Sequence, residues 1–186
     1  MNLAQGCDDY CYATLEYLVV EETLDRSIWV EFSQSRGPKV KRRKNMTPKE
    51  RAEKSAAAMW ESDNASVWLG MELVDVNEGT ATISLLVQKH HTNGHGICHG
   101  GITFTLADSA FAFACNSRNQ ATVAQHNVIS YTAPAKVDEV LTATATEISL
   151  NGRNGIYDVT VTNPKGETVA EFRGFSRSIK GQHFQE

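Results

Sequence analysis

The chain has 186 residues and a mass of 20.5 kDa, which suits one domain with an extension better than two full domains. A composition of 41% hydrophobic and 22% charged residues argues against wholesale disorder, and no apolar run is long enough to span a membrane. The net charge of −4 argues weakly against nucleic-acid binding. Four cysteines are too few for a disulfide scaffold, and no signal peptide opens the chain, so a reducing, cytoplasmic location is expected.

The chain divides near its second methionine. We expect residues 1–45 to be an N-terminal extension that is flexible or outside the fold, and residues 46–186 to form the domain. In the extension, the basic run 39–44 favours a solvated linker over a nucleic-acid patch, because no aromatic residue interleaves it. Cys7 and Cys11 lack a second Cys/His pair with finger spacing, so two ordinary thiols are favoured over half of a zinc site. Translation that begins at the domain's first methionine is an alternative.

Helix and strand signals then follow one another along the domain. Thr47, Pro48 and Glu50 fit the N-cap, N1 and N3 positions of a capping box, and an Ala-rich helix is predicted to run to Trp60 and break at 63–64. Six stretches rich in β-branched residues or alternating in polarity predict strands: 69–76, 80–89, 121–131, 139–150, 155–162 and 168–178.

Between the second and third of these strands, residues 102–116 predict one helix. Its apolar positions run nearly all round, which is typical of a helix buried on every side, and Asp108 is its one charged residue. The predicted class is therefore α+β, with one long helix wrapped by an antiparallel sheet. Because the sheet can hide only one helix face, we expect a second subunit to cover the other.

The loop 90–101 concentrates four of the six histidines, one thiol and four glycines. His91, His95 and His99 have the spacing of ligands on a helix face, but two intervening glycines cost about 1 kcal/mol each in a helix, so a metal site is disfavoured. A second alternative is Cys98 as a nucleophile, with His95 or His99 as its base. Neighbouring positions in sequence do not supply the geometry that such a pair needs, so an inert buried thiol is favoured.

A third interpretation uses the start of the predicted helix. His99, Gly100 and Gly101 lead into it, and the first N–H groups of a helix lack internal partners and can stabilise a developing oxyanion. Burying the carboxylate of Asp108 is costly, which favours a functional role for it. The alternative is a structural acid that caps or pairs with a nearby group. At 1.5 Å rise per residue Asp108 lies about 12 Å from Gly100, too far to act on the same carbonyl within one subunit. Across a dimer of antiparallel helices, however, Asp108 of one chain can face Gly100 of the other.

Three motifs carry a resemblance to a known family: Asn93-Gly94-His95, Cys98-His99-Gly100-Gly101 and Leu106-Ala107-Asp108. Together they resemble the signature of the hotdog-fold thioesterases of the phenylacetic acid degradation (PaaI) group, and the similarity extends over roughly residues 50–180. The resemblance implies a hotdog fold, assembled as a homodimer and often as a dimer of dimers. It also implies hydrolysis of acyl-CoA thioesters, such as phenylacetyl-CoA or hydroxyphenylacetyl-CoA, with no metal and no organic cofactor.

The same resemblance implies roles for single residues. Asp108 is the implied nucleophile or general base, the backbone N–H of Gly100 polarises the thioester carbonyl, and Asn93 places the substrate or a water. His99 is implied to orient the loop or to contact the thioester. Gly101 is a candidate substrate-binding residue because a glycine lets a substrate approach the backbone closely.

One stretch departs from the family pattern. Many relatives have a Ser or Thr near positions 124–126, facing the attacking water, whereas this chain has Gln125 and His126 there. We predict that both bind substrate, Gln125 by holding a water through its amide and His126 as an added titrating group, although a lone His on a strand is more often a packed or surface residue. The candidates for binding the CoA phosphates, each equally a solvated strand residue, are Arg153, Arg173, Arg177 and Lys180.

A homo-oligomeric thioesterase is the favoured function, and two alternatives remain open. A hotdog enoyl-CoA hydratase or dehydratase would use His99 with Asp108 to move a proton α to the thioester carbonyl. A non-catalytic acyl-CoA-binding module would keep the fold but tolerate the loss of Asp108, so the presence of that residue disfavours it. Release of free thiol from a CoA ester separates the three.

Overall fold

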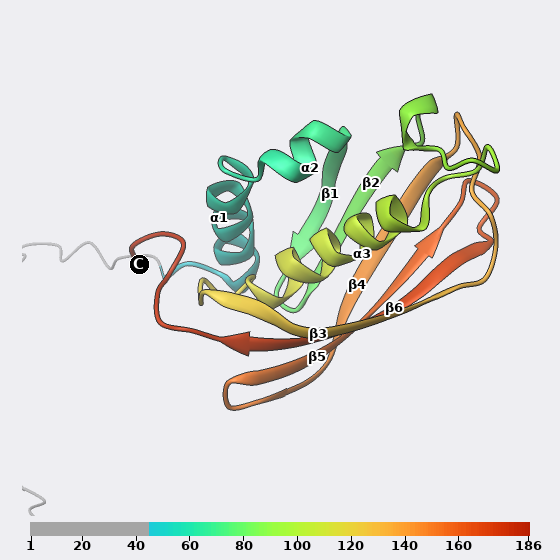
Figure 1. The fold of residues 1–186 in the computed structure, drawn as a ribbon. Coiled ribbons are helices and arrows are strands. Elements are labelled where there is room, and N and C mark those ends of the chain that lie inside the picture. The colour runs from blue at the N-terminus through green and yellow to red at the C-terminus, as the bar shows by residue number, and fades with distance from the viewer. Residues whose placement is uncertain (1–44) are drawn as a thin grey trace, which may run out of the picture. The chain divides into compact units, whose positions relative to one another are not determined.

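The computed structural model describes residues 45–186, in which a six-stranded antiparallel sheet wraps one long helix (Figure 1). In chain order the elements are α1 (Pro48–Trp60), α2 (Asn64–Leu69), β1 (Met71–Asn77), β2 (Thr80–Leu86), a 3₁₀ turn η1 (Lys89–His91), α3 (Gly100–Cys115), β3 (Thr122–Tyr131), β4 (Val140–Asn151), β5 (Asn154–Thr162) and β6 (Thr168–Ser178). The α+β class is thereby confirmed. The basic run and the two cysteines of the predicted extension lie outside the described residues, and the division of the chain near residue 46 stays a prediction.

The predicted start of the first helix is confirmed in atomic detail. The Thr47 side chain accepts a hydrogen bond from the Glu50 N–H at 3.2 Å, and the Glu50 carboxylate accepts one from the Thr47 N–H at 2.7 Å. With Pro48 at the first helical position, this capping box satisfies backbone donors that the helix itself leaves unpaired.

The sequence interpretation was wrong about the segment that follows α1. Residues 64–69 form α2, because Asp63 caps the Ser66 N–H at 3.1 Å and Gly70 ends the helix in the left-handed conformation at φ 73°. The first strand therefore begins at Met71, two residues later than predicted. The second predicted strand, 80–89, ends early at Leu86, because the chain turns into η1.

The strand order in the sheet is β1-β2-β4-β5-β6-β3, which leaves β1 and β3 as the edges. Edge strand β3 contains a β-bulge, since its pairing with β6 shifts register between Ala124 and His126. One extra residue in a strand transfers the following side chains to the other face. The bulge therefore places Asn127 on the face that meets α3 and His126 on the opposite face.

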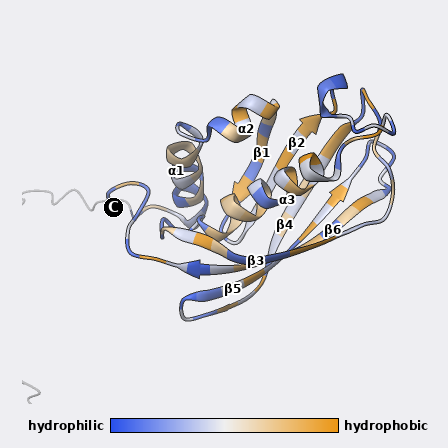
Figure 2. Ribbon diagram, in the orientation of Figure 1, coloured by the Kyte–Doolittle hydropathy of each residue, from blue (hydrophilic) through white to orange (hydrophobic). Residues whose placement is uncertain are grey.

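Helix α3 begins at Gly100, two residues before the predicted start, and packs against the inner face of the sheet. Phe111 is 1% exposed and lies against the rings of Tyr157 and Phe172, with centroids 5.5 and 5.9 Å away. Figure 2 shows the hydrophobic character of α3 beside strands whose hydropathy alternates along the chain. The side of α3 that carries Asp108 and Ala112 stays half-buried, so a single chain covers the helix on one side only.

Within residues 45–186, none of the helices combines the length and the apolar character needed to cross a membrane.

Candidate active site

The segment that precedes α3 is a closed loop, as its glycines suggested. Thr92 and Cys98 form an antiparallel bridge, and the Asn93 N–H donates to the Ile97 carbonyl at 2.9 Å. Gly96 turns the chain with φ 72°, a conformation that L side chains rarely adopt. The loop thereby returns the chain to the start of α3 and holds Asn93 beside it.

The first turn of α3 is organised by His99. Its Nδ1 accepts a hydrogen bond from the Gly101 N–H at 2.9 Å, so the neutral ring carries its proton on Nε2. The Gly100 N–H, in contrast, has no acceptor among residues 45–186. Tyr131 at the end of β3 donates its hydroxyl to the Gly100 carbonyl at 2.8 Å. Tyr131 was not predicted from the sequence, because no spacing rule connects an edge strand to a helix start thirty-one residues before it.

A cavity of about 430 Å³ opens at this helix start, and Asn93, Gly100 and Tyr131 are among the residues that line it. The Asn93 Oδ1 accepts the His95 N–H at 2.9 Å, which leaves the Asn93 Nδ2 as a donor without an acceptor in the described part of the chain. The two residues that carry these free donors, Asn93 and Gly100, therefore line one cavity. Such a pair can bind a carbonyl oxygen and stabilise the charge that develops on it.

Asp108 lies farther along α3 and is not among the residues that line this cavity. Burial raises the pKa of its carboxyl group, and a hydrogen bond from the Asn127 Nδ2 at 2.7 Å opposes that rise in part. An acid with a raised pKa in a half-buried position is a candidate base or nucleophile. The structure thus brings Asn93, Gly100, His99 and Gly101 together and leaves Asp108 apart from them within one chain.

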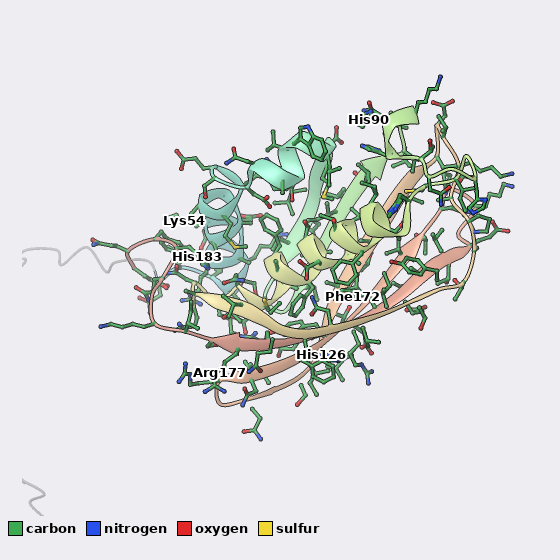
Figure 3. The ribbon with its side chains drawn as sticks, in the orientation of Figure 1. Lys54, His90, His126, Phe172, Arg177 and His183 are labelled. Carbon is green, nitrogen blue, oxygen red and sulfur yellow. The ribbon has the colours of Figure 1, made fainter. Side chains whose placement is uncertain are left out.

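The two predicted residues of β3 do not contact Asp108 in a single chain. Gln125 is the exposed bulge residue, and His126 packs its ring on Phe175 of β6, with centroids 5.5 Å apart, on the face of the sheet away from α3 (Figure 3). Their roles in binding substrate stay predictions. Asn127, which sequence analysis passed over for its neighbours, occupies the place beside the acid.

The basic residues predicted to bind CoA phosphates are not among the cavity's lining residues. Arg173 forms a bidentate ion pair with Asp158 on the outer face of the sheet, in which its Nε and Nη2 donate to the two carboxylate oxygens at 2.6 and 2.7 Å. The Arg153 Nε donates to the Ser178 carbonyl at 2.9 Å. Arg177 also lies on the outer side of the sheet (Figure 3), and Lys180 is exposed near the C-terminus. The phosphate-binding role of these four residues stays a prediction.

The buried thiols are not activated for nucleophilic attack. Burial raises the pKa of Cys98, whose Sγ lies 3.7 Å from the Thr103 hydroxyl, and burial raises the pKa of Cys115 to about 12. A thiol reacts as its thiolate, so both groups are poor nucleophiles near neutral pH. Among residues 45–186, no cluster of three His, Cys, Asp or Glu side chains could hold a metal ion.

Comparisons with known proteins show the family to which the chain belongs. Residues 95–170 match the Thioesterase superfamily model. The chain is 40% identical to the acyl-coenzyme A thioesterase PaaI of Escherichia coli over 131 residues, which is 70% of this chain and 94% of that protein. It is 32% identical to human acyl-coenzyme A thioesterase 13 over 120 residues, or 62% of this chain and 86% of that protein.

Solved structures give the same result. The E. coli PaaI protein from the phenylacetic acid degradation operon superposes with a TM-score of 0.72 at 39% identity, covering 73% of this chain and 99% of that one. A hypothetical thioesterase from Streptococcus pneumoniae, solved with coenzyme A, has a TM-score of 0.58 at 26% identity over 60% of this chain and 90% of that one. The fold, the motifs and the near-complete coverage of the E. coli relative together establish that this chain belongs to the PaaI family of hotdog-fold acyl-CoA thioesterases.

Proposed function

We propose that this thioesterase hydrolyses aryl-acetyl esters of coenzyme A, of the phenylacetyl-CoA or hydroxyphenylacetyl-CoA type, to the free acid and CoA. The relative that supports this substrate class is the E. coli protein, whose structure is described as coming from the phenylacetic acid degradation operon. The observation that carries the chemistry is the pair of unpartnered donors, the Gly100 N–H and the Asn93 Nδ2, at one cavity. This pair fits the carbonyl oxygen of a thioester.

The proposed active site joins two protomers. Gly100 and Asp108 are about 12 Å apart along one helix, so one chain cannot apply both to a single carbonyl. Two chains whose α3 helices run antiparallel bring Asp108 of one protomer to Gly100 of the other. The half-buried side of α3 supports this arrangement, as does the unpaired edge of β3, where Val128 is 51% exposed and Tyr131 53% exposed. We propose a homodimer on these grounds, pairing further into a dimer of dimers.

In the proposed reaction the thioester oxygen accepts hydrogen bonds from the Gly100 N–H and the Asn93 Nδ2. The ionised Asp108 carboxylate then acts in one of two ways: it attacks the carbonyl carbon to form a mixed anhydride that water hydrolyses, or it takes a proton from a water that attacks that carbon. In both routes the C–S bond breaks, and CoA leaves as a thiolate that takes up a proton. His99, with its ring proton on Nε2, is proposed to donate to the substrate, and Gly101 to let it approach the helix start.

Release of free thiol from a panel of CoA esters tests the function. We expect phenylacetyl-type esters to be hydrolysed faster than linear acyl esters, and Asp108→Ala to lower kcat on the order of 10²-fold or more. Asp158→Ala, on the outer face of the sheet, is the control and should leave kcat nearly unchanged. Faster turnover of linear esters would contradict the aromatic preference alone, whereas tight binding without turnover would favour the acyl-CoA-binding module.

The shared site has a separate test by complementation. Asp108→Ala and Asn93→Ala should each inactivate the enzyme, because each removes one half of both sites. After subunit exchange, half of the dimers combine one chain of each kind, and each mixed dimer regains one intact site, so about a quarter of the wild-type activity should return. No recovery, with exchange verified by mass spectrometry, would contradict a site built from two protomers. The cytoplasmic location, for its part, stays a prediction.

A further inference from the structure

The β-bulge of β3 gives Asn127 an unusual position for a strand residue. Asn127 pairs with Gly174 of β6, and both lie on the face of the sheet that meets α3. Gly174 has no side chain, and the Phe111 ring fills the space where one would be, since a β-carbon there would stand 2.8 Å from three ring atoms. Of the paired residues Asn127 and Gly174, therefore, only Asn127 has a polar side chain, an amide, that reaches α3.

Both ends of that amide are constrained. The Nδ2 donates to Asp108 at 2.7 Å, and within residues 45–186 this is the one side-chain hydrogen bond that the carboxylate receives. An ionised carboxylate can only accept, so the amide must present its nitrogen to Asp108 and turn its oxygen away. That Oδ1 is buried and has no hydrogen-bond partner in the described part of the chain. A buried amide oxygen without a donor is costly, so such a group points to a missing partner.

We propose, on the basis of the thioesterase function above, that Asn127 is a positioning residue of the hydrolysis. Its Nδ2 fixes the rotamer of Asp108, and its Oδ1 accepts a hydrogen bond from the water that attacks the substrate. This residue, and neither Gln125 nor His126, takes the place of the hydroxyl residue that this chain lacks near positions 124–126.

The geometry of the amide explains how one side chain serves both partners. The oxygen and nitrogen of an amide are bonded to the same carbon, so a water on Oδ1 lies next to the carboxylate that Nδ2 holds. That water can donate one hydrogen to the Asn127 Oδ1 and the other to Asp108, which leaves a lone pair free for the thioester carbon. In the attack a C–O bond forms, the water's proton passes to Asp108, the C–S bond breaks, and the proton then goes to the departing CoA thiolate.

Steady-state kinetics of Asn127→Ala, Asn127→Asp and Ser130→Ala on the best CoA ester test the proposal. Ser130 lies on the same strand, on its other face, and is exposed, so Ser130→Ala controls for a lost polar group. We expect Asn127→Ala to lower kcat about tenfold or more, with a smaller change in KM, because the amide that orients both the water and the Asp108 carboxylate is lost. Asn127→Asp has the same size, so it tests the role even if the alanine variant folds poorly.

The pH dependence of kcat/KM supplies the readout that a merely structural role would not move. The Asn127 hydrogen bond lowers the pKa of Asp108, so its loss should move the acidic limb of the profile to higher pH. Asn127→Asp adds a like charge and should move that limb further. Cys115, whose own high pKa Asp108 helps to raise, ionises far above this range and does not obscure the limb.

Each outcome decides the proposal. A lower kcat together with a displaced acidic limb, in a variant whose oligomeric state and circular dichroism match wild type, supports it. A folded Asn127→Ala or Asn127→Asp variant with wild-type kcat and an unmoved limb overturns it, and so does a loss of thermal stability alone. If the wild type and Ser130→Ala both release no thiol, the proposed function itself has failed, and the role of Asn127 falls with it.

Discussion

Gly174→Ala should destabilise the protein by crowding the core beneath the active site. The new β-carbon would meet three carbons of the Phe111 ring at 2.8 Å, well inside the usual contact of about 3.5–4.0 Å between carbon atoms. Phe111 cannot simply move, because it is 1% exposed and lies between Tyr157 and Phe172. Overpacking of this kind costs about 1–3 kcal/mol. For a domain of this size that cost lowers Tm by roughly 3–9 °C.

Thermal and urea unfolding of the variant measure this cost directly. Gly94→Ala is the matched control, because nothing lies within 4 Å of its added β-carbon and the backbone there is not left-handed, so its free energy of unfolding should change little. The double variant Gly174→Ala/Phe111→Leu should lose less free energy of unfolding than the sum of the two single variants, since the smaller leucine side chain relieves the clash. Wild-type stability in Gly174→Ala, or strict additivity in the double variant, would refute the argument.

Three further variants test other contacts of the structure. Asp108→Asn should abolish hydrolysis yet raise Tm at pH 7. Burial raises the pKa of Asp108 in the folded state. The protonated carboxyl group therefore stabilises the fold fully below its unfolded pKa of about 3.9, and this contribution is lost as the pH rises through the folded pKa. The variant's gain in Tm should vanish near pH 3, and an equal gain at both pH values would contradict the assignment. Tyr131→Phe removes the donor to the Gly100 carbonyl and should lower kcat several-fold while costing about 1 kcal/mol of stability, as kinetics and urea unfolding would show. Thr47→Ala removes the cap on the Glu50 N–H and should cost about 1 kcal/mol in urea unfolding with no change in kcat.

Local chemistry made much of the fold predictable from sequence. The capping box at Thr47 and the turn at Gly96 act through neighbours a few residues away, and the structure agrees with the predicted capping box and with the predicted non-helical loop before α3. The helix α2 was missed although its signals were present. Asp63 was interpreted as the end of one helix when it also caps the next, and Gly70 supplies the left-handed residue that ends it.

The part of the candidate site that sequence could not give depends on long-range pairing. The position of the register shift between β3 and β6 decides which of Gln125, His126 and Asn127 faces Asp108, and no local sequence pattern marks that position. Tyr131 is similar, because its contact with Gly100 exists only once the edge strand lies beside the helix start. Motifs near one another in the chain were found, whereas partners supplied by the sheet were not.

The two buried thiols have a practical consequence for measuring this enzyme. Reagents that detect the CoA product react with thiolates, and at pH 8 a thiol with a pKa of about 12 is ionised in only about one molecule in 10⁴. In the folded chain Cys115 should therefore contribute almost no colour to a continuous assay, and Cys98, whose pKa burial also raises, should react more slowly than an exposed thiol. Unfolding should expose both thiols and add their colour to the signal. The same reagent can report turnover under native conditions and, in denaturant, the loss of the native core.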